Sequence, residues 1–349
     1  MRKIGRQSLL LHVGFLVCGF STLLTAALAP WLAHRYALQN AQLGTYFFLQ
    51  FIAAVFTAAI STRSPRFSLR AGFLLLSGFV LLPVSHAASL AGAILVGLGL
   101  GLISPATNAV GAYSDEPVQE LMSLNFVWSI GALLVSLALF DVQRFAIRAI
   151  TVISIVALGV GLLWLAIPVS DLRNSKSSEP NLRAEILFAA ALFLYAGAEV
   201  GISSWSKLAA DAAALPALWV AILIGRFAAP ILIAKRWITD SNTLFCSLSL
   251  AGVTAVSVPL TEDVRIRTAL MFVCGLGLGP CFPLVVHTFS RVVSQSRQWA
   301  FLTCGVGAAS VPWLMGHGSR WVALPKTYLI PAVALGMTGL LCKASMSKR

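Results

Sequence analysis

The chain has 349 residues, of which 58% are hydrophobic and 11% are charged, and its mean hydropathy is +0.87. This is more apolar surface than a soluble protein of this length can bury, so a soluble protein is excluded. The net charge of +13 would suggest nucleic-acid binding in a soluble protein, but here the basic residues flank apolar runs, where phospholipid headgroups lie. We therefore predict an integral membrane protein whose partner is the lipid bilayer, with no nucleic acid.

Twelve apolar segments of about 16 to 25 residues alternate with short polar connectors, and each is long enough for a helix to cross roughly 30 Å of hydrocarbon. Strands facing lipid would leave backbone groups unpaired, so helices are expected. The predicted spans are residues 9–32, 45–60, 71–85, 88–112, 123–140, 147–169, 186–206, 216–234, 242–260, 268–288, 299–315 and 327–342. The first span follows a basic start like a secretory signal, but it is too long for a signal core, and Pro30 follows the one plausible cleavage site. A retained first helix is therefore predicted.

The distribution of basic residues predicts the orientation of the chain. An even number of spans places both termini on one side, and connectors on that side carry roughly twice as many Lys and Arg residues as those opposite. The positive-inside rule then predicts a multi-pass protein of the cell (inner) membrane with both termini cytoplasmic.

A polar connector divides the predicted spans into six and six. Residues 170–185 are charged and contain a proline, which is typical of an interdomain linker. We predict an N-terminal six-helix bundle at 1–169, a cytoplasmic linker at 170–185 and a C-terminal six-helix bundle at 186–349.

Glycine motifs recur at nearly constant offsets between these halves. The matched pairs are residues 97–101 with 275–279 and Gly19 with Gly197, all at an offset of 178, and residues 130–132 with 306–308, at an offset of 176. Glycine is common where membrane helices approach closely, so one match alone is weak. Three in register favour two parallel six-helix repeats, an architecture that places solute near the membrane midplane.

One acidic residue, Glu199, lies deep inside a membrane-length apolar run, residues 186–206. A carboxylate costs a few kcal/mol or more there, so it normally faces a polar cavity or a partner. Arg226, in the next predicted span, is the natural partner. At 1.5 Å per residue, Glu199 lies about 21 Å and Arg226 about 14 Å from the cytoplasmic ends of their helices, and this gap is within reach of an arginine side chain. Tyr195 precedes Glu199 by one turn on the same face.

Three interpretations of Glu199 remain open. In the first, Glu199 and Arg226 form a permanent salt bridge that holds two helices together. In the second, Glu199 couples transport to a proton or contacts solute. In the third, Glu199 is a lone solvated acid. Burial favours a neutral carboxyl and a nearby cation favours the carboxylate. The first and fourth predicted spans contain no acid, so Glu199 carries the coupling hypothesis alone.

Amides with aromatic neighbours are candidates for contact with a neutral polar solute. They are Tyr46 with Gln50 in the second span, Asn108 in the fourth, and Asn125 with Trp128 in the fifth. Amides bond without fixed charge, and rings supply a flat apolar face. Hydrogen bonding between helices is the alternative for each of them.

The second half supplies candidates for gating and for the cavity wall. Pro280 and Pro283 remove two backbone donors from the tenth span, which favours bending there. His287 could titrate near neutral pH, although its place near the cytoplasmic end favours packing or gating. Trp205 and Trp313 are candidates to line an outer cavity, with interface anchoring as the alternative.

Motifs along nearly the whole chain carry a resemblance to a known family. They are residues 41–44 (AQLG) leading to Gln50, the glycine-rich fourth span ending in Asn108, residues 197–201 (GAEVG) with Trp205, residues 225–226 (GR), residues 279–283 (GPCFP) and residues 312–313 (PW). With these motifs the chain resembles the major facilitator superfamily and, within it, the fucose permease-like sugar:proton symporters.

The resemblance implies an all-α polytopic membrane protein with twelve transmembrane helices in two six-helix pseudo-repeats. It implies a transporter, not an enzyme, that moves a small sugar-like solute by alternating access coupled to a proton or another ion. It adds Phe282 and Tyr195 to the expected solute contacts, and a monomer with no cofactor or metal is expected. The alternatives are a proton-driven exporter of drugs or metabolites, a transporter-like sensor or a membrane enzyme.

Overall fold

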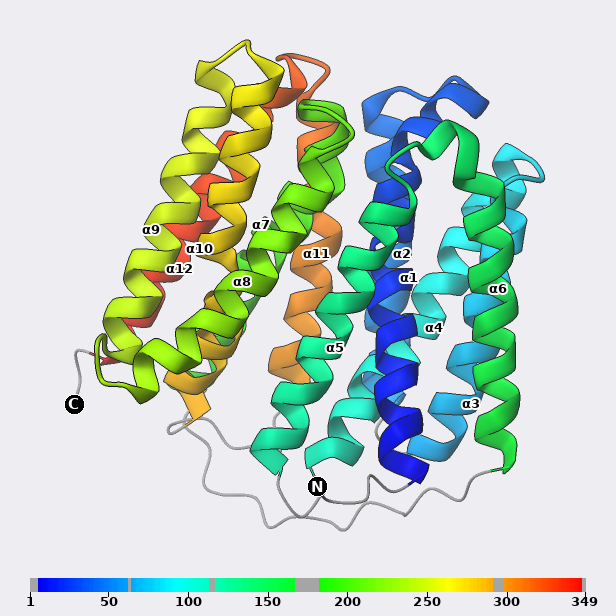
Figure 1. The fold of residues 1–349 in the computed structure, drawn as a ribbon, viewed down its shortest axis with the longest axis horizontal. Helices are drawn as coiled ribbons and strands as arrows, with labels where there is room; N and C mark the ends of the chain where they lie inside the picture. The colour runs from blue at the N-terminus through cyan, green and yellow to red at the C-terminus, as the bar shows by residue number, and fades with distance from the viewer. Residues whose placement is uncertain (1–5, 62–63, 113–116, 167–181, 291–297, 347–349) are drawn as a thin grey trace. The chain divides into compact units, whose positions relative to one another are not determined.

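The computed structural model describes residues 6–61, 64–112, 117–166, 182–290 and 298–346 (Figure 1). Within these ranges the chain is helical and contains no β-strand, as predicted. Most of the predicted linker, residues 170–181, lies outside the described residues, and its last four residues form the first turn of α7.

The described helices follow the predicted spans in order (Figure 1). They are α1 (Arg6–Tyr36), α2 (Asn40–Ser61), α3 (Pro65–Leu76), η1 (Ser77–Leu81), α4 (His86–Ala112), α5 (Pro117–Ala138), α6 (Val142–Ala166), α7 (Leu182–Ala209), α8 (Ala214–Ala234), α9 (Asp240–Ser257), η2 (Val258–Leu260), α10 (Val264–Ser290), α11 (Gln298–Gly318), η3 (Leu324–Tyr328) and α12 (Leu329–Met346).

Nine segments of the described chain are long and apolar enough to cross a membrane, and α5 contributes a shorter one, Ser123–Ala138. The nine coincide with the predicted first, second, fourth, sixth to tenth and twelfth spans. The protein is therefore a multi-pass helical membrane protein. That α3 with η1, α5 and α11 also cross the bilayer remains a prediction.

Contacts between Cα atoms divide the chain into two compact units. Among the described residues, unit 1 contains 6–31 and 49–166, and unit 2 contains 32–48, 182–290 and 298–346. Both α1 and α2 contribute to both units, because the segment Leu32–Phe48 groups with the helices that follow the predicted linker.

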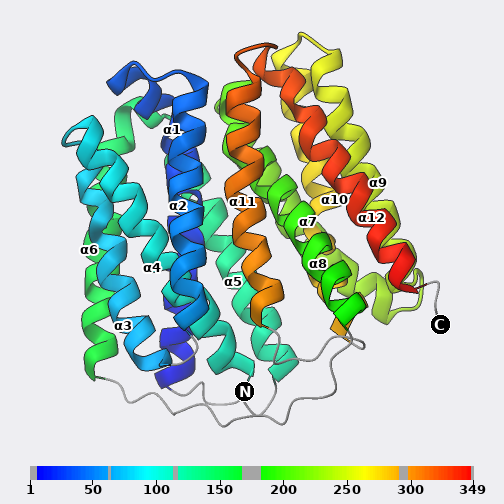
Figure 2. The same ribbon diagram turned by 180° about the vertical axis from the view of Figure 1, so that it is seen from behind.

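Corresponding helices pack together within each unit. In unit 1, α3 packs against α4 and α6. In unit 2, α9 packs against α10 and α12, and both views show α12 running alongside α9 (Figures 1 and 2). Unit 2 also pairs α8 with α10, and α7 with α11 and α12.

The recurring glycines make the same kinds of contact in the two units. In α4, the outer glycines of the motif at 97–101 face carbonyl oxygens of α2, and the middle glycine faces one of α3. In α10, the outer glycines of the motif at 275–279 face carbonyl oxygens of α8, and the middle one faces α9. Helix backbones in lipid associate through such small residues. The matched glycines therefore mark equivalent helix crossings in each unit.

A second matched pair joins the remaining helices of each unit. A Cβ at Gly131 of α5 would overlap the carbonyl oxygen of Leu16 in α1, and a Cβ at Gly307 of α11 would overlap that of Phe193 in α7. Any side chain at either glycine would push two helix backbones apart.

Arg70, one of the basic residues between the second and third predicted spans, binds the end of α6. Its Nε donates to the carbonyl oxygen of Trp164 at 3.0 Å, and its Nη2 donates to that of Leu165 at 3.3 Å. These carbonyls belong to the last described turn of α6, and a cation there complements the helix dipole. Arg70 thus ties the start of α3 to the end of α6.

We predict that Gly307→Ala destabilises the protein. The added methyl group would overlap the Phe193 carbonyl oxygen, and overpacking of this kind costs about 1–3 kcal/mol. Gly336→Ala in α12 is the matched control, because a Cβ there meets nothing within 4 Å. Thermal unfolding in detergent should show a lower midpoint for Gly307→Ala only. Equal midpoints for the two variants would contradict the close approach of α7 and α11.

Candidate functional site

The site in unit 2 is built around Glu199, whose carboxylate lies between α7 and α8. Arg226 Nη2 lies 3.5 Å from Glu199 Oε1, and both side chains are 12% exposed. Tyr195, one turn earlier in α7, donates its hydroxyl to Glu199 Oε2. The structure therefore brings together Glu199, Arg226 and Tyr195, and the guanidinium spans the difference in depth that helical spacing predicts.

The Tyr195 hydroxyl also connects this site to α10. Its oxygen lies 3.0 Å from the carbonyl oxygen of Leu278. A phenol has a single proton, so Leu278 and Glu199 compete for one donor. The Phe282 ring lies 6.2 Å from the Tyr195 ring, which places this predicted solute contact beside the same group.

Pro283 explains why Arg226 reaches the backbone of α10. A residue in an α-helix donates its N–H to the carbonyl four residues earlier, and proline has no N–H. Pro283 therefore leaves the Gly279 carbonyl without that partner. The Arg226 Nε lies 3.4 Å from the Gly279 oxygen and supplies a donor from α8. Arg226 thus links the buried carboxylate to the broken ladder of α10.

Pro280 creates a second such place one turn away. It removes the helical donor to the Leu276 carbonyl, and Gly225 of α8 faces that oxygen, where an added Cβ would lie at 2.7 Å. Consecutive residues of α8, Gly225 and Arg226, therefore lie against the carbonyls that the two prolines expose. A helix with two internal prolines thus meets an ion pair at this place.

The geometry of the ion pair permits it to open. A charge-assisted hydrogen bond between a guanidinium and a carboxylate is usually about 2.7–2.9 Å long, whereas the Arg226 to Glu199 distance is 3.5 Å. In low-dielectric surroundings the attraction is strong, but Arg226 has the Gly279 carbonyl and Glu199 has the Tyr195 hydroxyl as other partners. Neither group would be left without a hydrogen bond if the pair separated.

Gln50 is fully buried in unit 1 and contacts α1. Its Nε2 lies 3.4 Å from the Thr22 carbonyl oxygen. Its Oε1 is buried with no hydrogen-bond partner among the described residues, and the same holds for the hydroxyls of Ser21 and Thr25 on α1. Unit 1 therefore contains buried polar atoms with spare hydrogen-bonding capacity around a residue predicted to contact solute.

The other predicted contacts of unit 1 lie on α4 and α5. Asn108, Asn125 and Trp128 are each half-buried. The Trp128 carbonyl oxygen faces Gly19 of α1, where a Cβ would overlap it. Trp128 thus lies at the crossing of α1 and α5, which gives it a packing role whatever else it contacts.

The predicted aromatic residues of unit 2 gather where α2, α7 and α11 meet. Phe47 packs edge-on against Trp205 at a centroid distance of 5.3 Å, and Trp205 donates its Nε1 proton to the Pro312 carbonyl at 3.0 Å. Trp313 lies 6.1 Å from Phe48 between ring centroids. Trp205 is fully buried, so it does not anchor the helix at the membrane surface.

Tyr46 lies in the same segment of α2 and is fully buried. At the neighbouring Gly44, a Cβ would lie 3.4 Å from Trp313 backbone atoms, and at Gly316 a Cβ would lie 2.7 Å from the Asn40 carbonyl oxygen. The start of α2 is thus packed backbone to backbone against α11.

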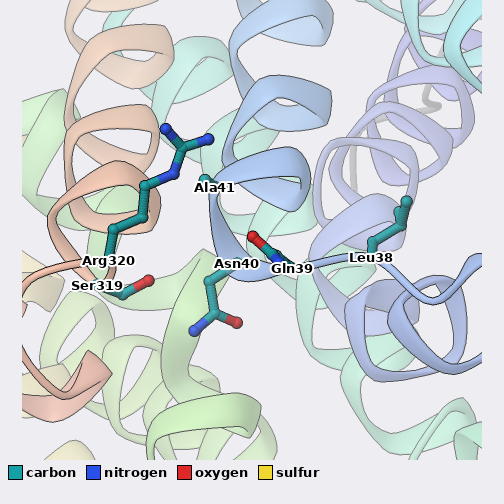
Figure 3. Close-up of a pocket in the computed structure, with 6 residues that line it drawn as sticks. All are labelled: Leu38, Gln39, Asn40, Ala41, Ser319 and Arg320. Carbon is teal, nitrogen blue, oxygen red and sulfur yellow. The ribbon is translucent and has the colours of Figure 1, made fainter.

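A pocket of about 320 Å³ lies beside this contact, between the turn that joins α1 to α2 and the end of α11. Arg320 and Ser319 form one wall and residues 38–41 form the other (Figure 3). None of the predicted site residues lines it. Its amides and guanidinium make it polar, but it lies in the connecting turns and away from Glu199.

The remaining predicted gating residue, His287, belongs to α10, but its side chain lies outside the described part of the structure. No group of three or more His, Cys, Asp and Glu side chains among the described residues is arranged to hold a metal ion.

A polar cluster that the sequence does not predict lies in unit 1, where His12 and Ser8 of α1 meet Glu120 and Ser123 of α5. Glu120 had been placed in a connector outside the apolar span. Histidine near the start of one span and an acid just ahead of another gave no signal of contact, because their helices are separated by more than 100 residues.

The arrangement of the described helices is a fold known from membrane transporters. No protein-family model and no curated protein sequence matches the chain. Among solved structures, the major facilitator superfamily (MFS) transporter FucP in its outward conformation superposes with a TM-score of 0.70, at 18% identity over 99% of each chain. FucP is described as the fucose:proton symporter of E. coli.

Two further MFS-fold structures match closely. The xylose transporter XylE from E. coli, in an inward open conformation, has a TM-score of 0.79 at 13% identity, over 97% of this chain and 96% of its own. A POT family transporter in complex with a thioalcohol conjugated peptide has a TM-score of 0.76 at 12% identity, over 98% and 96%. This chain therefore has the fold of MFS transporters, as its motifs had indicated, and the neighbours named here are transporters, not enzymes.

We predict that Arg226→Met destabilises the protein more than the double variant Arg226→Met/Glu199→Gln. Removing only the cation leaves a buried carboxylate without its charge partner, which costs on the order of 3 kcal/mol, whereas the double variant leaves no charge. The unfolding midpoint in detergent, at neutral pH, would measure both. If the single variant is as stable as the double, the two groups do not form an ion pair in the folded protein.

Proposed function

We propose that this chain is a secondary active transporter that moves a small polar, sugar-like solute by alternating access and couples that movement to protons. In this proposal residues 1–169 and 186–349 form two six-helix pseudo-repeats, and all twelve helices cross the inner membrane with both termini cytoplasmic. The energy comes from the proton gradient, and binding shifts the populations of inward-open and outward-open states.

The observation that carries the proposal is the buried Glu199 and its connection to α10. An ionisable pair inside an apolar span is costly and marks a pathway for ions or solute. Here the pair reaches, through Arg226 and Tyr195, the backbone of a helix that two prolines have weakened. A change of charge at Glu199 thus acts on the place where α10 bends most easily.

The coupling step follows from the hydrogen bonds. A proton bound to Glu199 removes its negative charge and with it the attraction to Arg226. Arg226 then keeps its bond to the Gly279 carbonyl, and the protonated carboxyl can donate to the Tyr195 oxygen, so the Tyr195 proton is free to go to Leu278. Proton binding thereby shifts two donors toward α10. Release of the proton restores the ion pair and draws them back.

The nature of the solute is inferred from uncharged polar groups. The buried amide of Gln50 with the hydroxyls of Ser21 and Thr25, and the amides of Asn108 and Asn125, suit a neutral ligand rich in hydroxyl groups. The neighbours FucP and XylE are named for fucose and xylose, which agrees with this chemistry. A thermal-shift screen of sugars, organic acids and lipophilic cations on the purified protein would identify the ligand.

We predict that Glu199→Gln abolishes uphill accumulation of the solute found in that screen while it leaves solute exchange intact. Glutamine keeps the hydrogen bonds but cannot bind and release a proton. Uptake would be measured in proteoliposomes with an imposed pH gradient, and exchange with solute on both sides. The exposed Glu262, changed to Gln, is the control and should accumulate normally. Full uphill uptake by Glu199→Gln would refute the coupling role.

We predict that Pro283→Ala slows exchange without weakening solute binding. Alanine restores an N–H aimed at the Gly279 carbonyl, so the helix repairs its own ladder and Arg226 loses an acceptor. The rate of exchange in proteoliposomes should fall several-fold, and the thermal shift produced by solute should stay unchanged. An unchanged exchange rate would show that the bend at Pro283 takes no part in transport.

A proton-driven exporter of drugs or metabolites is the second candidate, because the first and fourth helices carry no acid in their apolar spans. The sign of the response to a pH gradient separates the two. A symporter accumulates solute on the alkaline side of the membrane, whereas an antiporter accumulates it on the acidic side.

A further inference from the structure

The pocket beside α11 lies within unit 2 and takes no part in the proposed transport step. It encloses about 320 Å³ between the turn that joins α1 to α2 and the end of α11. Residues 38–41 form one side, and Ser319 with Arg320 form the other (Figure 3). Both sides belong to the same compact unit. Sites for small molecules usually measure about 300–1,000 Å³, so this volume suits a small ligand.

Arg320 supplies the charge of this pocket. No acidic side chain is among the described residues that line it. In the described part of the chain, the Arg320 guanidinium has no hydrogen-bond or ion-pair partner, and Figure 3 shows it extending alongside the start of α2. Arg267 of α10, by contrast, donates to the carbonyl oxygens of Thr261 and Ala209, at 2.9 and 3.2 Å. The unused N–H groups of Arg320 require an acceptor, and their planar arrangement matches a carboxylate or a phosphate.

The opposite side of the pocket also offers donors. Asn40 and Ala41 are the first two residues of α2, so their backbone N–H groups have no acceptor within the helix. The Asn40 side-chain amide adds two further N–H donors. The preceding N–H, that of Gln39, is already bound to Gln42 Oε1 at 2.8 Å. The free donors of this side are therefore those of Asn40 and Ala41, which line the pocket together with Arg320.

Ser319 gives the pocket an acceptor. Its hydroxyl donates to the Gly316 carbonyl oxygen at 2.7 Å. The single proton of the hydroxyl is used there, so its lone pairs remain for a donor on a ligand. A hydroxyl group next to a negatively charged oxygen would satisfy both Ser319 and Arg320.

We propose that this pocket binds the oxyanion of a small ligand, a carboxylate or a phosphate, between Arg320 and the first peptide groups of α2. The charged oxygens accept from the guanidinium and from the N–H groups of Asn40 and Ala41, and a neighbouring hydroxyl donates to Ser319. The site is separate from the amides around Gln50, which suit a neutral solute. The proposal does not rest on the transport function, because binding is measurable without a gradient.

The test is an NMR titration of the full chain in maltoside micelles free of phospholipid. The chain has six asparagines, so it would be labelled with ¹⁵N-asparagine and the Asn40 signals assigned by their loss in Asn40→Ser. Sodium phosphate, sodium gluconate and dihexanoyl phosphatidylglycerol would each be added at constant ionic strength. D-glucitol, the uncharged counterpart of gluconate, is the ligand control. We expect a saturable shift of the Asn40 backbone signal with an oxyanion and none with D-glucitol.

The three oxyanions distinguish the sources of the ligand. A shift with phosphate or gluconate supports the proposal and assigns the site to a soluble anion. A shift with phosphatidylglycerol alone supports it and assigns the site to a lipid headgroup. A bound oxyanion should also raise the unfolding midpoint of the protein, because it binds the folded state and bridges α2 to the end of α11.

A pair of arginine variants makes the test specific. Arg320→Gln should weaken binding by about tenfold or more, because the charged donor is lost. Arg265→Gln is the matched control, since it removes an exposed arginine from the first turn of α10 and should bind as the unchanged protein does. Unfolding midpoints without ligand would show that both variants are folded. Absence of a saturable shift with every oxyanion, an equal shift with D-glucitol, or unchanged binding by Arg320→Gln would overturn the proposal.

Discussion

A carbonyl that loses its helical donor inside a membrane has no water to replace it, and this constraint shapes unit 2. Pro283 withdraws the donor from Gly279, and the donor that takes its place comes from another helix, as the guanidinium of Arg226. A guanidinium brought to that depth in turn needs a negative charge, which Glu199 provides. The proline therefore creates the need for the cation, and the cation creates the need for the acid. Loss of Arg226 would leave the Gly279 carbonyl without this donor and Glu199 without its cation.

Much of the fold could be predicted from the sequence because the underlying geometry is regular. Apolar length predicts a span, and a fixed rise per residue places Arg226 within side-chain reach of Glu199. The glycine motif at 97–101 and its counterpart at 275–279 likewise predict close crossings, and they occupy corresponding crossings on neighbouring helices. These features need only local spacing.

Features that depend on which distant helices touch could not be predicted in this way. The meeting of His12 with Glu120 requires α1 and α5 to be neighbours with a particular rotation, and neither residue stands out in its own segment. The prolines of α10 could be read as weak points, but their spacing does not reveal that Arg226 serves as the substitute donor. The grouping of Leu32–Phe48 with unit 2 depends on ring and backbone contacts to Trp205 and Trp313. Amino-acid composition carries no information about these contacts.

That grouping has a mechanical consequence. The division between the units falls within two continuous helices, between Trp31 and Leu32 in α1 and between Phe48 and Leu49 in α2. Pro30 lies directly before the first of these points and removes one rung of the α1 hydrogen-bond ladder. Pro30 therefore makes α1 easiest to bend beside the point where the helix passes from one unit to the other, whereas α2 is held near Gly44 by its close backbone contact with α11.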